Sequence, residues 1–132
     1  MFTQEESQLM EMAKEAAEHA YSPYSHFKVG AAVLTDKGNI YKGCNIENAS
    51  YSLTICAERN AATQAVYQGD TGFKLIAVYV DSDIIFPPCG ACRQFLSEFS
   101  ASVPIIYFNH KESRKTSLDK LLPESFQLAD LK

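Results

Sequence analysis

The sequence predicts an α/β sandwich, a sheet covered by helices, formed by a single domain over residues 1–132. Two observations support this prediction. Segments expected as strands and helices alternate in the second half of the chain, which indicates parallel strands joined by helical crossovers. In addition, the runs 75–80 and 103–108 are among the longest apolar stretches, and such runs are typical of strands buried on both faces of a sheet.

Local signals in the first half of the chain indicate a helix followed by a hairpin. Thr3 and Glu6 have the spacing of a capping box, and apolar residues recur at helical spacing behind them. The sequence Asp36-Lys37-Gly38 between two apolar segments predicts a hairpin turn. The elements expected in this half are a helix over 4–20, a break at 22–25 and strands over 28–35 and 39–45.

The second half is divided by glycine and proline. Gly69 marks the end of an alanine-rich helix, and Pro87-Pro88 requires an extended loop before the next helix. Pro123 closes the last element. The elements expected in this half are helices over 56–68 and 90–100, strands over 75–80 and 103–109, and a short helix over 116–122.

The charge of the chain disfavours a nucleic-acid partner. Twelve Lys and Arg residues stand against sixteen Asp and Glu residues, which gives a net charge of −4. The one basic cluster is Lys111, Arg114 and Lys115, whereas proteins that hold nucleic acid usually carry a basic face. We therefore expect a small-molecule substrate and no nucleic-acid partner.

Neither a membrane span nor a signal peptide is expected. The apolar runs are far shorter than the roughly 18 residues that a membrane span needs. The first six residues include Glu5 and Glu6 and lack the basic and apolar regions of a signal peptide. We expect a cytoplasmic protein without a membrane partner, in which cysteines are reduced and serve metal binding or catalysis rather than disulfides.

Three of the four cysteines lie in two short motifs, Cys56-Ala57-Glu58 and Pro88-Cys89-Gly90-Ala91-Cys92. Both motifs stand at expected helix starts, where the helix dipole favours thiolates. Three thiolates from two neighbouring helix ends would hold a zinc ion and leave one coordination position open, as in catalytic sites. Glu58 would stand beside that position as a general acid/base.

The same residues allow a second interpretation, a closed structural zinc site with Cys44 as the fourth ligand and Glu58 as a surface acid. Cys44 is instead expected to be a small buried residue of a strand. Arg59 is a candidate donor of hydrogen bonds to the cysteine sulfurs, which would offset their negative charge, and Arg93 is a weaker candidate for the same role.

Taken together, these motifs have the order of the zinc-dependent deaminase signature, and the sequence resembles the small homotetrameric cytidine deaminases over nearly its whole length. The matching segments are 24–32 (Tyr-Ser-His-Phe-Lys-Val-Gly-Ala-Ala), 43–49 (Gly-Cys-Asn-Ile-Glu-Asn-Ala), 56–59 (Cys-Ala-Glu-Arg), 88–94 (Pro-Cys-Gly-Ala-Cys-Arg-Gln) and 121–126 (Leu-Leu-Pro-Glu-Ser-Phe).

The resemblance implies a three-layer α-β-α sandwich with a five-stranded mixed sheet, whose fifth strand would be the segment near 114–117. It implies a homotetramer with shared active sites and one zinc ion per subunit. The activity implied is hydrolytic deamination of cytidine and 2′-deoxycytidine, with release of ammonia, in pyrimidine salvage. The implied zinc ligands are Cys56, Cys89 and Cys92, with Glu58 as the proton shuttle.

The resemblance also implies how a nucleoside is bound. Asn45 and Glu47 would hydrogen-bond the ribose, and their spacing on an extended segment points both side chains the same way. Phe27 would pack on the pyrimidine, and the Ala57 N–H would bind its 2-carbonyl. The residues implied to line neighbouring active sites across subunit boundaries are Tyr51 and Phe126.

Three alternatives remain at this stage. A deaminase for a related compound such as blasticidin S would share the zinc motifs. An enzyme that edits RNA or DNA would need a channel for a strand. A zinc-stabilised binding module would hold the metal without turnover. The segment 45–48 and Phe27 favour cytidine over the first alternative, and Glu58 argues against the last.

Overall fold

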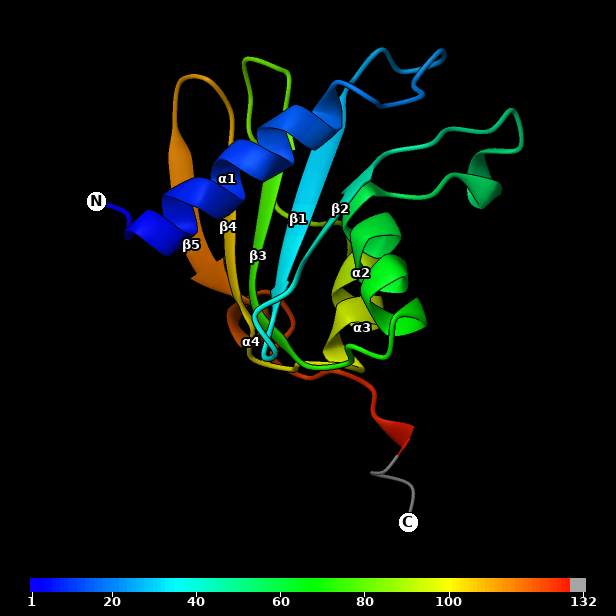
Figure 1. Ribbon diagram of the computed structural model, residues 1–132. Coiled ribbons are helices and arrows are strands. Elements are labelled where there is room, and N and C mark those ends of the chain that lie inside the picture. The colour runs from blue at the N-terminus through cyan, green and yellow to red at the C-terminus, as the bar shows by residue number, and fades with distance from the viewer. Residues whose placement is uncertain (129–132) are drawn as a thin grey trace.

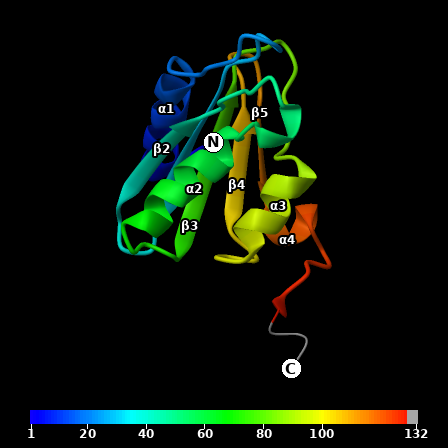
Figure 2. The same ribbon diagram turned by 90° about the vertical axis from the view of Figure 1, so that its right-hand side faces the viewer.

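The computed structural model describes residues 1–128 and contains a five-stranded sheet with helices on both faces (Figure 1). Helix α1 covers one face, and α2 and α3 lie on the other (Figure 2). The three-layer α-β-α sandwich is therefore confirmed. In chain order the elements are α1 (Gln4–Ala17), β1 (Val29–Thr35), β2 (Ile40–Cys44), the 3-10 turn η1 (Tyr51–Leu53), α2 (Ala57–Tyr67), β3 (Phe73–Val80), α3 (Gly90–Ser97), β4 (Pro104–Phe108), β5 (Ser113–Ser117) and α4 (Leu118–Leu121).

The sheet has the strand order β2-β1-β3-β4-β5. Strands β3 and β4 form the parallel pair, and the other neighbours are antiparallel, so the sheet is mixed as expected. The fifth strand is β5, at the position that the resemblance implied. The helix expected over 116–122 is wrong at its start, because residues 116 and 117 pair with Ile105 and Pro104 as the end of β5.

Two helices are shorter than the sequence predicts. The first ends at Ala17 and not at residue 20, because the chain turns there so that the Tyr21 N–H can donate to the Asn45 carbonyl, at 2.9 Å. The helix expected over 90–100 ends at Ser97. The residues after Ser97 turn away from the helix axis, and the Ser100 hydroxyl donates to the carbonyl of Phe73 on β3 at 3.1 Å.

Side-chain alternation along the central strands creates two cores, one on each face of the sheet. Ala31 and Val33 on β1 face α2 and α3, while Ala32 and Leu34 face α1. The strand is buried at six of its seven positions, which explains why its sequence is continuously apolar rather than alternating.

Glycines let both helical layers approach the sheet closely. A Cβ atom at Gly30 would lie only 2.0 Å from the Ala13 carbonyl oxygen of α1, so no larger residue fits there. Gly43 on β2 plays the same part under α2. The close packing of α2 on β2 fixes the position of the first turn of α2. One of the two cysteine motifs lies at this turn.

Over residues 1–128, the helices are all too short or too polar to cross a membrane.

Candidate active site

Three cysteines meet at the N-terminal ends of two neighbouring helices. Cys56 is the N-cap of α2, Cys89 is the N-cap of α3, and Cys92 lies in the first turn of α3. Their sulfur atoms all lie within 4.8 Å of one another, and those of Cys56 and Cys89 are 3.8 Å apart. The structure therefore brings together the three residues that the sequence predicted as metal ligands.

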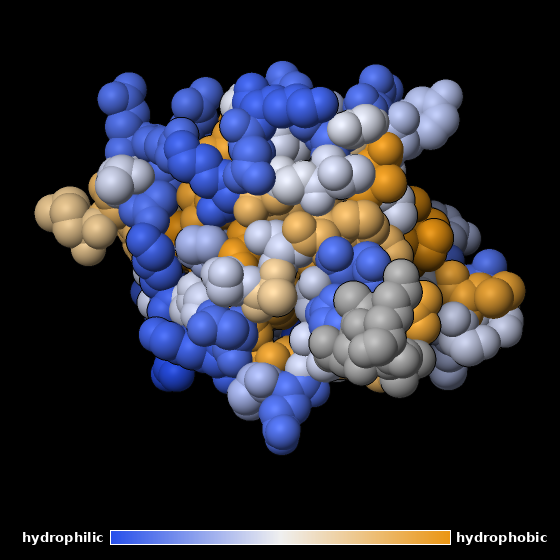
Figure 3. All heavy atoms as spheres, turned by 90° about the horizontal axis from the view of Figure 1, so that it is seen from below, coloured by the Kyte–Doolittle hydropathy of each residue, from blue (hydrophilic) through white to orange (hydrophobic). Residues whose placement is uncertain are grey.

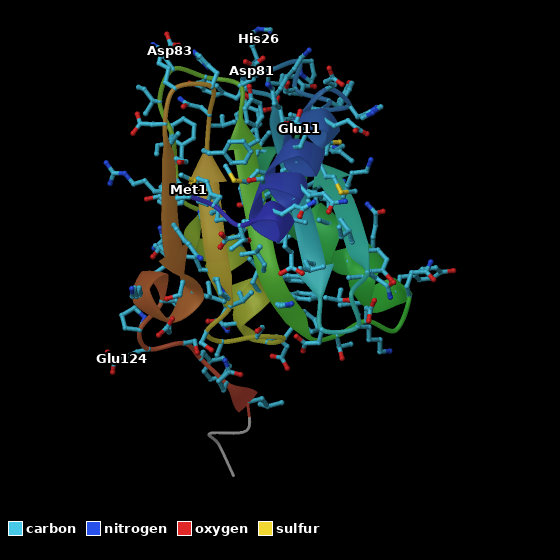
Figure 4. The ribbon with its side chains drawn as sticks, turned by 60° about the vertical axis from the view of Figure 1, so that its left-hand side comes forward. Met1, Glu11, His26, Asp81, Asp83 and Glu124 are labelled. Atoms are coloured by element: carbon cyan, nitrogen blue, oxygen red, sulfur yellow. The ribbon has the colours of Figure 1, made fainter. Side chains whose placement is uncertain are left out.

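These cysteines lie beside the carboxyl ends of the parallel strands β3 and β4, where open α/β sheets commonly bind ligands. Figure 4 shows His26, Asp81 and Asp83 at this end of the molecule, and Glu124 at the opposite end. His26 has a φ of 65°, a left-handed conformation that is uncommon for a residue other than glycine. The residue that follows it is Phe27.

The donor set fits a zinc ion. Thiolate sulfur is a preferred zinc ligand, and three protein ligands are the number that catalytic zinc sites use. Positive charge is also present, since the Arg59 Nη2 donates to the Cys56 sulfur at 3.6 Å and to the Thr54 carbonyl at 3.2 Å. The Arg59 Nε is buried and has no hydrogen-bond partner among residues 1–128, so its N–H is available beside the sulfur cluster.

The thiols of this cluster titrate unequally. Hydrogen bonds from the Cys92 thiol and from Arg59 lower the pKa of Cys56 to about 5. The pKa of Cys92 is raised, because its thiol donates to Cys56 and is itself buried. A cation placed among the three sulfurs would favour the deprotonated form of each, because metal ligation requires the thiolate.

Glu58 is buried in the first turn of α2, two residues after Cys56. Removal from water raises the pKa of its carboxyl group to about 7. The side chain lines a cavity of about 250 Å³ together with Cys56, Ala57 and Cys89. A buried acid that titrates near neutral pH beside a metal site has the properties of a general acid/base.

Most of the remaining cavity wall is apolar. Sequence reasoning placed Ala57 and Asn45 there, but it missed the other lining residues. The one available signal was the position of Phe86 directly before the Pro-Pro-Cys sequence. The residues missed are Val29, Thr54, Val78, Val80 and Phe86, and Pro87 also lines the wall.

Asn45 lines this cavity and is bonded to Phe27, which is not itself a lining residue. The Asn45 amide donates to the Phe27 carbonyl at 2.8 Å and accepts from the Val29 N–H at 2.9 Å. The Phe27 ring lies edge-on to Phe86, with ring centroids 5.9 Å apart. Phe27 is 45% exposed, so an apolar ring face is open to a ligand.

Glu47 is oriented by the loop that precedes Phe27. Its Oε1 accepts from the N–H groups of Tyr24 and Ser25, and its Oε2 accepts from the Ser25 hydroxyl. These bonds hold the pKa of Glu47 below its usual value, so it is a carboxylate at neutral pH. With Tyr51 and Thr54, these residues line a second hollow.

Tyr51 and Phe126 do not reach the cavity of their own chain. Tyr51 is 75% exposed and packs edge-on against Tyr24 at a centroid distance of 6.1 Å. Phe126 is 62% exposed, and its backbone is held by the Gln94 side chain. Within one chain, neither residue lines the cavity that holds Glu58, although Tyr51 shares the second hollow with Glu47.

Two secondary expectations can also be compared with the structure. Cys44 lies outside the three-cysteine group, and its thiol donates to the His19 carbonyl at 3.4 Å, so the interpretation with four cysteine ligands is wrong for this structure. The weaker expectation, that Arg93 donates hydrogen bonds to the cysteine sulfurs, is wrong. Its guanidinium instead donates to the carbonyls of Pro88 and Leu121.

Comparison with known proteins agrees with this geometry. Residues 3–108 match the family model described as the cytidine and deoxycytidylate deaminase zinc-binding region. The chain is 49% identical over 125 residues to a cytidine deaminase of Sporosarcina psychrophila, covering 93% of this chain and 92% of the relative. It is 45% identical over 132 residues to a probable cytidine deaminase of Dictyostelium discoideum, covering 99% and 90%.

Solved structures show the same relationship. The crystal structure of cytidine deaminase from Burkholderia pseudomallei superposes with a TM-score of 0.87 at 43% identity, over 95% of this chain and all of that one. Cytidine deaminase from Mycobacterium tuberculosis gives a TM-score of 0.83 at 38% identity, over 96% and 100%. With the cysteine cluster and the buried Glu58, these matches show that the chain belongs to the cytidine deaminase family of zinc-dependent hydrolases.

Proposed function

We propose that this chain deaminates both cytidine and 2′-deoxycytidine, giving uridine, 2′-deoxyuridine and ammonia, and that it serves pyrimidine salvage in the cytoplasm. The observation that carries the proposal is the buried Glu58 in one cavity with Cys56 and Cys89. An acid/base beside a three-thiolate metal site matches the requirements of hydrolytic deamination. The apolar cavity accepts a flat ring, and the mouth offers groups for a sugar.

Cys56, Cys89 and Cys92 would hold the zinc ion, and Arg59 would donate a hydrogen bond to the Cys56 sulfur. When bound, zinc lowers the pKa of a water molecule so that it becomes a nucleophile at neutral pH. The two helix N-termini and Arg59 reduce the cost of gathering three negative sulfurs.

Glu58 would move the protons of the reaction. Its carboxylate takes a proton from the attacking water and delivers it to ring N3, which makes C4 more electrophilic. It would then take the proton of the hydroxyl group newly bound to C4 and give it to the amino group, so that the C4–N bond breaks and ammonia leaves. Burial supports this role, because the carboxyl group exchanges protons with the substrate rather than with bulk water.

The base would lie between Phe27 and the apolar wall, with the Ala57 N–H bonded to its 2-carbonyl. Ala57 is the first residue of α2, where a backbone N–H lacks a helical acceptor. Asn45 and Glu47 would hydrogen-bond the ribose, chiefly its 3′-hydroxyl. Both nucleosides have that hydroxyl, which supports activity on ribose and deoxyribose forms alike.

We further propose that residues 1–132 act as one domain in a homotetramer with shared active sites. Tyr51 and Phe126 would complete the sites of neighbouring subunits, since each is exposed and neither lines the cavity of its own chain. The end of the molecule with the C-terminal segment shows apolar surface among hydrophilic side chains (Figure 3). Exposed apolar patches of this kind mark association surfaces.

The test is the ultraviolet absorbance of cytidine, and separately of 2′-deoxycytidine, incubated with zinc-loaded protein. Loss of the cytidine band with an equal amount of ammonia supports the proposal. Loss for cytidine alone would remove deoxycytidine from it. No change for either nucleoside, with zinc bound, would contradict the assigned substrate class. Sedimentation of the same preparation as a monomer would contradict the shared sites.

A further inference from the structure

The segment 86–89 forms one wall of the cavity and ends at a candidate metal ligand. Phe86, Pro87 and Cys89 line the cavity, and Pro88 between them is fully buried. Neither proline has a backbone N–H. At these two positions the backbone can therefore only accept hydrogen bonds, through its carbonyl groups. The donor must come from another part of the protein.

Arg93 supplies such a donor. Its Nε donates to the Pro88 carbonyl at 2.7 Å, and its Nη1 donates to the Leu121 carbonyl at 2.9 Å. The guanidinium thus bridges the wall of the cavity and α4. A planar group with several donors in fixed directions suits this task, because both bonds form without further ordering of the side chain.

Helix stability does not explain an arginine at this position. Arg93 is the fourth residue of the eight-residue helix α3, and a cation near a helix N-terminus interacts unfavourably with the helix dipole. The acceptor on α4 is well anchored, because Leu118 is fully buried and its N–H donates to the Val103 carbonyl at 2.9 Å. The bridge therefore connects the proline segment to a fixed part of the core.

We propose that Arg93 is a positioning residue of the active site, which fixes Cys89 and the Phe86–Pro87 wall by tying Pro88 to α4. This inference rests on the proposed role of Cys89 as a metal ligand. The bridge holds the Cys89 sulfur at the distance that the other two thiols require.

The test compares Arg93→Gln and Arg93→Lys with the wild-type protein and with Arg114→Gln. Arg114 lies on the edge strand β5 and is exposed, so its substitution removes the same charge without touching the bridge. The first measurement is the rate at which zinc passes from each zinc-loaded protein to a coloured chelator. The second is kcat and KM for cytidine, expressed per bound zinc.

For Arg93→Gln we expect zinc release to be faster and kcat to be lower, each by about 10-fold or more, as for other residues that orient metal ligands. KM rises less than kcat falls, because Arg93 supports only the wall beside the base, whereas the residues proposed to bind ribose lie on other segments. For Arg93→Lys we expect a zinc-release rate and a kcat between those of wild type and Arg93→Gln, since an ammonium cannot bond both carbonyls in the same geometry. Arg114→Gln matches wild type.

Equal zinc release in Arg93→Gln and wild type would overturn the inference. Wild-type behaviour of Arg93→Lys beside an impaired Arg93→Gln would also overturn it, because charge alone would then suffice. Should Arg93→Gln fail to fold by circular dichroism, the Arg93→Lys comparison decides. Zinc release needs no substrate, so it tests Arg93 even if the proposed deamination of cytidine is not observed.

Discussion

Gly43 on β2 lies directly against the backbone of Ala61 on α2. A Cβ atom at Gly43 would be 2.4 Å from the Ala61 nitrogen and 2.8 Å from the Ala57 carbonyl oxygen. Atoms of the helix backbone cannot move aside as a flexible side chain can. The close packing of α2 on the sheet, and with it the position of Cys56 and Glu58, thus depends on the lack of a Cβ atom at Gly43.

Gly43→Ala is accordingly expected to push α2 away from the sheet. Overpacking of a well-packed site costs about 1–3 kcal/mol, and we expect a loss of this size in the free energy of unfolding, measured in urea. Cytidine turnover should fall as well, because Cys56 and Glu58 move with the helix. The matched control is Gly90→Ala, where an added Cβ meets no atom within 4 Å. Equal stability of the two variants would show that α2 is not seated by Gly43.

Glu58→Gln should abolish most of the activity while zinc stays bound. The amide has nearly the same shape as the carboxyl group but cannot take a proton from water. Positioned acid/base groups contribute typically 10²–10⁴-fold, so we expect kcat to fall by about 10³-fold, measured on protein with confirmed zinc content. Glu58→Asp serves as the control, because it keeps a carboxyl group and should keep part of the activity. Wild-type turnover by zinc-loaded Glu58→Gln would exclude Glu58 as the proton shuttle.

A buried acid far from the active site should make stability depend on pH. The Oδ2 of Asp70 accepts hydrogen bonds from Asn39, Tyr41 and Thr35, and these bonds, led by that from Asn39, hold the pKa of Asp70 below its usual value. A carboxyl group with a depressed folded-state pKa stabilises the protein above its unfolded pKa, about 3.9. This contribution is lost as the pH falls through the folded-state value.

Asp70→Asn should therefore lower the urea midpoint at pH 7, and the gap to wild type should narrow as the pH falls below about 4. Comparing the two proteins at each pH cancels the titration of the cysteines, which both share. A gap that stays constant down to pH 3 would mean that the Asp70 charge contributes nothing to stability.

The side chain of Gln94 should protect the C-terminal segment around Phe126 from local opening. The side-chain amide of Gln94 donates to the Phe126 carbonyl at 2.7 Å and accepts from the Phe126 N–H at 3.2 Å. Two hydrogen bonds of about 1 kcal/mol each correspond to roughly a 30-fold rise in the open population when they are removed. We expect Gln94→Ala to be cleaved at Phe126 about 30-fold faster by a chymotrypsin-type protease. Gln8→Ala, at an exposed position of α1, is the control. Equal cleavage of both variants would show that the Gln94 hydrogen bonds do not hold the C-terminal segment.

The elements predicted from sequence were those whose signals are local. The cap formed by Thr3 and Glu6 is present, and the apolar runs became β3 and β4. The cysteine motifs lie at helix starts, as their spacing predicted. Local signals sufficed here because capping and strand burial are properties of a few consecutive residues.

What local signals did not reveal depends on contacts between distant segments. The residues of β5, Ser-Arg-Lys-Thr-Ser, show no apolar pattern, since an edge strand with exposed positions needs none; only the resemblance indicated it. Arg93 was read as a partner of the neighbouring sulfurs, but its second acceptor, Leu121, lies 28 positions along the chain. Phe86 lines the cavity together with Val29 and Asn45, which come from distant segments of the chain.

Cys56 and Cys89 are separated by 33 positions in the chain, yet their sulfurs are 3.8 Å apart. Everything between them, namely α2, β3 and the proline segment, must be in place before the ligands can meet. An ion held by both ends therefore closes a long loop, and it binds the folded chain far better than the unfolded one. Zinc should thus be bound only once folding is complete. Depletion of zinc should shorten the lifetime of the folded protein as well as abolish its activity.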